Sequence, residues 1–76
     1  MKQQDFIESF AAQYDDVEVS SLTLDTLFRN VEGWSSLTAL SIIAMIDEEY
    51  DVCLNGNDIR ASETIGDIIN IVNTKI

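Results

Sequence analysis

The sequence predicts an all-α domain: a small bundle of three main helices and one short helix, with a long first loop. The chain has 76 residues, a length that suits one domain, and apolar residues recur in it at helical spacing. Only the segment around Val17 and Val19 alternates as a strand would, and an isolated strand has no sheet to join. We therefore expect residues 1–76 to form a single helical domain.

The first helix is expected to run from about Gln3 to Tyr14. Its apolar residues share one face: Phe6, Ile7, Phe10, Ala11 and Tyr14. The connection from Asp15 to Ser35 is long for a compact domain, and we expect a short helical turn near Thr26–Arg29. Four apolar residues indicate that this connection is held against the core: Leu22, Leu24, Leu27 and Phe28.

The longest helix is expected over Leu37–Tyr50. Ser35 is a suitable N-cap, which makes Ser36 the first residue inside the helix. A stripe at core-facing spacing follows, flanked by Met45 and Glu49: Ala39, Ile42, Ile43, Ile46 and Tyr50. Trp34, just before the helix, is expected to be a packing anchor rather than a binding platform.

A second apolar strip lies on nearly the opposite side of this helix. Its members are Leu37, Leu40 and Ala44, continued by the acidic residues Asp47, Glu48 and Asp51. A helix with one buried face has no folding reason to carry such a strip, which indicates a docking surface for a partner protein. The alternative is that the loop before the helix covers Leu40.

Ser36 lies at the N-terminal end of the second strip. A phosphate on its hydroxyl would face backbone N–H groups that lack helical partners, and also the positive end of the helix dipole. A Ser-Ser pair before an apolar run also fits a plain helix start, so Ser35 and Ser36 alone do not decide between the two interpretations.

The last third of the chain contains a turn signal and two further helices. Asn55–Asn57 is the turn signal, and Asp58–Ala61 has room for a short helix with Ile59 pointing inward. Thr64 and Asp67 have the spacing of a capping box at the start of the last helix. The apolar face of that helix is expected to comprise Ile65, Ile68, Ile69, Val72 and Ile76.

Composition excludes several classes of function. With 4 basic and 14 acidic residues the net charge is −10, which disfavours nucleic acid and anionic membranes and favours basic protein surfaces. The absence of histidine excludes serine–histidine catalysis and imidazole metal ligands. Cys53 is the single cysteine and is expected to be buried as a small apolar residue.

A calcium site is also rejected, because Cys53 and Ser62 stand where the calcium-loop pattern requires ligands. No membrane-spanning stretch or signal-peptide core is recognisable. We expect a soluble, cytoplasmic monomer with no catalytic residue and no metal.

The stretch Gly33–Leu40, followed by Ile46–Tyr50, resembles the acyl carrier protein family. That family's motif is Asp-Ser-Leu at the start of a long acidic helix, and its serine carries 4′-phosphopantetheine. The run Thr64–Ile69 resembles the family's last helix, and the resemblance covers essentially the whole chain. One residue departs from the motif, since Ser35 stands where the family has aspartate.

The resemblance implies a non-enzymatic carrier. Ser36 would hold 4′-phosphopantetheine, transferred from coenzyme A by a magnesium-dependent phosphopantetheinyl transferase, and the arm would carry acyl groups as thioesters. Partners would be acyl-loading and acyl-processing enzymes of fatty-acid, polyketide or related biosynthesis. Their basic patches would dock on Leu37, Leu40, Ala44, Asp47 and Glu48.

Two questions stay open at the level of sequence. Ser35 leaves room for an alternative function, an acidic adaptor with the carrier fold that binds proteins and is never modified. The cargo could be a fatty, polyketide, aminoacyl or other acyl group, and Trp34 together with Ser35 favours a specialised pathway.

Overall fold

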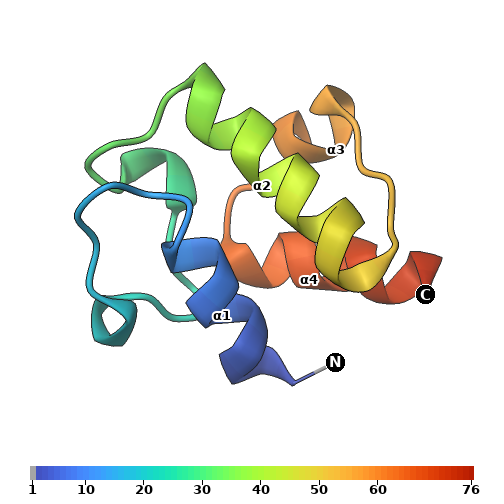
Figure 1. Ribbon diagram of the computed structural model, residues 1–76, viewed down its shortest axis with the longest axis horizontal. Helices are drawn as coiled ribbons and strands as arrows, with labels where there is room; N and C mark the ends of the chain where they lie inside the picture. Colours follow the sequence, from blue (N-terminus) through green and yellow to red (C-terminus); the bar gives the residue numbers. More distant parts are fainter. Residues whose placement is uncertain (1) are drawn as a thin grey trace.

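The computed structural model describes residues 2–76, and Met1 of the expected 1–76 domain lies outside the described residues. The described chain is helical, as predicted (Figure 1). Its elements are α1 (Gln3–Ala11), the 3₁₀ turns η1 (Val19–Ser21) and η2 (Phe28–Asn30), α2 (Ser36–Tyr50), α3 (Gly56–Arg60) and α4 (Ile65–Lys75).

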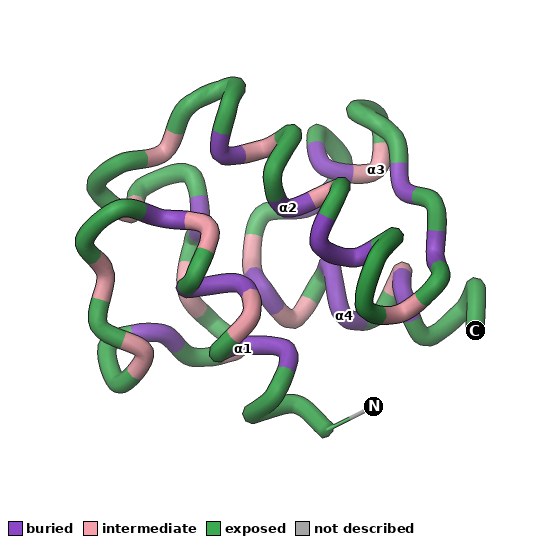
Figure 2. Tube along the Cα trace, in the orientation of Figure 1, coloured by how far each residue is buried: buried purple, intermediate pink, exposed green. Residues whose placement is uncertain are grey.

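The helices surround one hydrophobic core. Figure 1 shows α2 crossing in front of α4, with α1 beside both and α3 behind the N-terminal half of α2. α1 contacts α2 and α4, and α3 contacts α4. Figure 2 marks buried residues along the trace of every helix. The largest fully buried apolar side chains are Phe6, Phe10, Phe28, Ile42, Ile46, Ile65, Ile68 and Val72. Each such side chain contributes about 1.5–3 kcal/mol by leaving water.

α1 ends at Ala11, three residues before the expected end. The next amide groups bond to carbonyls three residues back, Gln13 N–H to Phe10 O and Tyr14 N–H to Ala11 O, both at 3.1 Å. This tightening turns the chain while keeping Tyr14 buried. The Tyr14 hydroxyl donates to Phe28 O at 2.8 Å and so ties α1 to η2.

The long loop is held by its backbone as well as by its apolar side chains. Leu22 and Phe28 are buried, as expected, but Leu27 is 46% exposed. The reason is a pairing with the segment before α4: Phe28 N–H donates to Glu63 O, Ile65 N–H to Thr26 O, and Gly66 N–H to Leu24 O. This pairing forms an isolated bridge between Leu27 and Thr64 and moves the expected turn from Thr26–Arg29 to Phe28–Asn30.

The segment that follows α2 corrects two expectations. Cys53 is exposed, because the chain is extended here and its neighbours Val52 and Leu54 point into the core instead. Asn55 does not form a separate turn. It caps α3, which begins at Gly56, and forms a capping box with Asp58.

Three expectations for the last helices are confirmed, and one is wrong. Ile59 of α3 is buried, and Thr64 and Asp67 form the capping box of α4. The inward face of α4 holds Ile65, Ile68, Ile69 and Val72. Ile76 is 71% exposed, because α4 ends at Lys75 and Ile76 extends past the core.

Candidate functional site

The N-terminus of α2 is fixed by a small hydrogen-bond network. Ser35 is the N-cap, as predicted, and its hydroxyl accepts from the Thr38 amide at 3.3 Å. The Thr38 hydroxyl lies 3.2 Å from that of Ser35 and donates to Gly33 O at 2.9 Å. Gly33 has a φ of 98°, which L side chains rarely adopt, so this turn favours glycine. The approach to the helix and its first turn therefore form one unit.

Ser36 is the first residue of α2 and is exposed. The cap hydrogen bond is made by the neighbouring Ser35, so the Ser36 hydroxyl is not the group that caps α2. The first turn of α2 contains no acidic residue, although the chain as a whole carries a charge of −10. A phosphodiester on Ser36 would meet backbone N–H groups and the positive end of the dipole without a carboxylate in the same turn.

A hollow of about 360 Å³ adjoins Ser36, between the N-terminal half of α2, Trp34 and α3. We call it the Ser36 hollow. It is lined by Arg29, Trp34, Ser35, Ser36, Ala39, Leu40, Ile43, Gly56, Ile59 and Arg60. Apolar side chains supply most of this lining, and no acidic residue is part of it.

The hollow explains how α2 departs from the expected core stripe. Ile42 and Ile46 are fully buried, and Met45 is buried with them. Ala39 and Ile43 are only half-buried because they line the hollow. Tyr50, the last residue of the expected stripe, is also half-buried. Its ring packs against that of Phe6, with ring centroids 5.6 Å apart.

Trp34 is a packing anchor, as predicted. Its ring centroid lies 5.1 Å from that of Phe28 and 6.4 Å from that of Tyr14. The same side chain also lines the Ser36 hollow. It therefore connects the aromatic core to the neighbourhood of Ser36.

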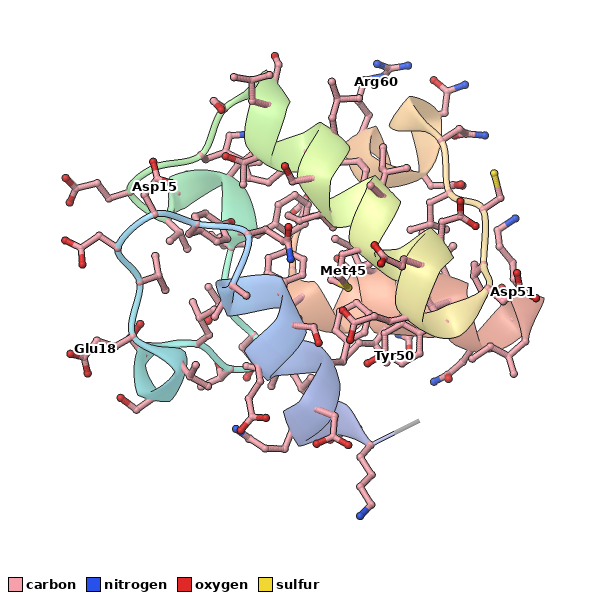
Figure 3. The ribbon with its side chains drawn as sticks, viewed as in Figure 1. Asp15, Glu18, Met45, Tyr50, Asp51 and Arg60 are labelled. Atoms are coloured by element: carbon pink, nitrogen blue, oxygen red, sulfur yellow. The ribbon has the colours of Figure 1, made fainter. Side chains whose placement is uncertain are left out.

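Two arginines of the hollow were not singled out from the sequence. Arg29 donates to Ile59 O at 2.6 Å, and its guanidinium carbon lies 4.9 Å from the centroid of the Phe28 ring. Arg60 donates to the side-chain oxygen of Asn57. Figure 3 shows Arg60 at the end of the molecule where α2 begins. No sequence signal joins these arginines, because they belong to η2 and α3 and only the fold brings them to one hollow.

The second strip is exposed along its length. Leu37 is 75% and Leu40 61% exposed, and Ala44, Asp47, Glu48 and Asp51 are exposed as well. The loop before α2 does not cover Leu40, so that alternative is wrong. Leu40 also lines the Ser36 hollow, which makes the strip and the hollow adjacent.

Other kinds of site find no support in the described part of the chain. Among residues 2–76, no group of three or more His, Cys, Asp or Glu side chains could hold a metal ion. Within the same residues, no helix is both long and apolar enough to cross a bilayer.

Comparison with known proteins gives low-identity relatives that carry one name. A protein named acyl carrier protein in Treponema pallidum (strain Nichols) is 27% identical over 70 residues, which cover 92% of this chain and 90% of the relative. A protein of the same name in Exiguobacterium sp. (strain AT1b) is 24% identical over 59 residues, which cover 78% of this chain and 75% of that relative. No family model and no solved structure matches the chain. The relatives support a non-enzymatic carrier role.

Proposed function

We propose that this chain is an acyl carrier protein that holds 4′-phosphopantetheine on Ser36. The observation that carries the proposal is the position of Ser36, an exposed hydroxyl at the first residue of α2 and at the edge of the Ser36 hollow. The low-identity relatives of the same name support it. When bound, the arm would supply a terminal thiol that holds an acyl group as a thioester.

The residues around Ser36 would help attach phosphopantetheine only by positioning the reacting oxygen, and the transferase would supply the catalytic groups. The Ser36 oxygen would give its proton to a base of the transferase and form a bond to the phosphorus of coenzyme A that carries pantetheine. The P–O bond between that phosphorus and the adenosine-side phosphate would break, and adenosine 3′,5′-bisphosphate would leave with the bonding electrons. A phosphopantetheinyl transferase with magnesium would catalyse this exchange. The chain contributes an accessible oxygen, backbone N–H groups directed at the new phosphate, and a helix start fixed by Ser35 and Thr38.

The second strip would be the docking surface for partner enzymes. Leu37, Leu40 and Ala44 offer apolar contact, and Asp47 and Glu48 offer charge to a basic patch. The transferase and the acyl-loading and acyl-processing enzymes would share this surface, because it begins beside Ser36. Leu37 and Leu40 are both exposed and lie three positions apart on one face of α2, and adjoining exposed apolar side chains indicate an interaction surface where a single one would not.

The second candidate is an adaptor with the same fold that is never modified. Ser35 favours it, because the residue before the modifiable serine carries no charge here, whereas the family motif places aspartate there. The two candidates share the second strip and differ only at the Ser36 hydroxyl.

Intact-mass measurement separates the two candidates. After incubation with coenzyme A, magnesium and a transferase, we expect the mass to rise by one phosphopantetheinyl group. Ser36→Ala should abolish the gain, and Ser35→Ala should retain part of it. Modification that persists in Ser36→Ala, or that maps to Ser35, would refute the proposal. A chain that stays unmodified with several transferases and in its own cells would be the adaptor.

A further inference from the structure

We infer that the Ser36 hollow receives an acyl cargo that ends in a carboxylate, with the carboxylate against Arg29 and Arg60 and the body of the cargo against the apolar lining. The inference rests on the proposed function, because the cargo would reach the hollow on the arm of Ser36. It concerns the chemical class of the cargo, which the relatives' names do not specify.

The apolar part of the hollow defines the body of the ligand. Trp34, Ala39, Leu40, Ile43 and Ile59 present hydrocarbon surface to it. From Ser36 to Ile43 the lining extends along α2 for about 10 Å, at about 1.5 Å per residue. The volume, about 360 Å³, is near the lower end of the roughly 300–1,000 Å³ of small-molecule sites. A short acyl chain suits these dimensions better than a long one.

The charge of the hollow defines the end of the ligand. The chain has 4 basic and 14 acidic residues, yet the lining includes two of the basic residues and none of the acidic ones. An anionic cargo is repelled by most of a surface with a net charge of −10. The Ser36 hollow is where the fold offsets that repulsion.

The two guanidinium groups are held in place by neutral partners. Arg29 is fixed by Ile59 O and by the Phe28 ring, and Arg60 is fixed by the side chain of Asn57. A side chain at Gly56 would have its Cβ 3.5 Å from a guanidinium nitrogen of Arg60, so this arginine lies folded against the start of α3. A guanidinium has five N–H donors, so these contacts leave donors for a carboxylate, which it can bind through two parallel hydrogen bonds.

Matched thioester probes test the inference on the unmodified protein. S-glutaryl-N-acetylcysteamine ends in a carboxylate, and S-pentanoyl-N-acetylcysteamine is a neutral analogue with a similar chain. Binding is followed by the fluorescence of Trp34, the single tryptophan, and by amide shifts of Ala39 and Ile59 in NMR spectra. We expect the glutaryl probe to bind about three- to tenfold more tightly, because a partly exposed ion pair adds a modest gain. Equal affinity would overturn the inference.

Charge-matched variants locate the effect. Arg60→Gln should remove most of the preference for the glutaryl probe, while Lys75→Gln, which loses the same charge outside the hollow, should keep it. Arg29→Lys keeps the charge but changes the donor geometry, and should retain part of the preference. If Lys75→Gln reduces the preference as much as Arg60→Gln does, the effect is net charge alone and the inference is wrong.

The modified protein separates the cargo from the arm's own phosphate. With the arm in place, the amide shifts at the hollow are compared for the bare thiol, the pentanoyl and the glutaryl forms. We expect Arg60→Gln to change the glutaryl form specifically. A change of equal size in all three forms would assign Arg60 to the phosphodiester and refute the cargo class. Failure of Ser36 modification refutes the carrier proposal, whereas the preference for free probes is measured independently of it.

Discussion

Ser35 Oγ lies 3.3 Å from the amide nitrogen of Thr38, so the serine that stands where the acyl carrier motif has aspartate caps α2. Aspartate and serine are near-equal N-caps, and the two differ chiefly in charge. Compared with an aspartate at this position, Ser35 therefore gives a similar helix start and places no negative charge beside Ser36.

The variant Ser35→Asp tests what that charge does. If a transferase binds the usual aspartate through a basic group or magnesium, the variant should be modified about ten- to a hundredfold faster, which corresponds to a charge-assisted hydrogen bond of about 1.5–3 kcal/mol. The melting temperature should change little. Ser35→Asn is the control, because it keeps a cap without the charge and should react like the parent. Equal modification rates for the parent and both variants would mean that the transferase does not recognise the residue at position 35.

Tyr14 gives the fold a predictable response to alkaline pH. Burial raises the pKa of Tyr14 to about 12, above the ordinary value of about 10. The folded chain thus retains this proton where the unfolded chain loses it, so the contribution of Tyr14 to stability is present below about pH 10 and is lost as pH rises towards 12. Stability should fall across this window, as measured by urea unfolding at several pH values.

Tyr14→Phe isolates that contribution. The variant should cost about 1–3 kcal/mol at neutral pH, because it leaves the Phe28 carbonyl without the Tyr14 hydroxyl. Its loss of stability between pH 10 and 12 should be shallower than in the parent. Tyr50→Phe is the comparison, because the pKa of Tyr50 is also raised, by burial and then by Glu49 and Asp5, so this variant measures the part of the alkaline slope that does not come from Tyr14. If Tyr14→Phe shows the same alkaline slope as the parent, this assignment is wrong.

The parts of the fold that follow from local chemistry could be predicted from the sequence. The Ser35 cap and the Thr64 capping box depend on residues three positions apart, and both are confirmed. The inward positions of Ile42, Ile46 and Ile68 depend on helical spacing and are also confirmed. Each of these features is set within a few turns of the chain.

The parts that were missed depend on contacts between distant residues. Leu27 is exposed because its segment pairs with the chain before α4, and no periodicity within the loop reports that pairing. Arg29 and Arg60 meet at the Ser36 hollow only because η2 and α3 flank the same half of α2. The burial expected for Cys53 came from its residue type, whereas the extended backbone at this point decides its exposure.

Asp51 offers a test of charge crowding. It ends α2 in the left-handed region, with a φ of 55°, close to Glu48 and Glu49 and at the end of the helix where the dipole disfavours anions. Asp51→Asn keeps a residue that tolerates this conformation and removes the charge. It should raise stability by about 0.3–1 kcal/mol at low salt, measured by thermal unfolding.

Salt should reduce the advantage of Asp51→Asn. The parent's melting temperature should rise with sodium chloride, and more steeply per mole with magnesium or calcium, because cations screen a net charge of −10. The gap between parent and variant should narrow as salt is added. If the melting temperature of the parent does not change in either salt titration, repulsion among the negative charges does not contribute much to its free energy of unfolding.

The last prediction separates the two kinds of contact in the second strip. Glu48 is exposed and should act mainly on the rate of encounter with a basic partner, so Glu48→Lys should slow association and weaken its dependence on salt. Leu37 is 75% exposed, and Leu37→Ala should speed dissociation while leaving the melting temperature nearly unchanged. Stopped-flow or surface-based kinetics with the transferase as partner would measure both rates.

The matched control is Ile76→Ala. Ile76 lies outside the strip and is 71% exposed, close to the exposure of Leu37, so truncating it should alter neither rate. Unfolding of Leu37→Ala, or equal kinetic effects at Leu37 and Ile76, would place the docking surface elsewhere.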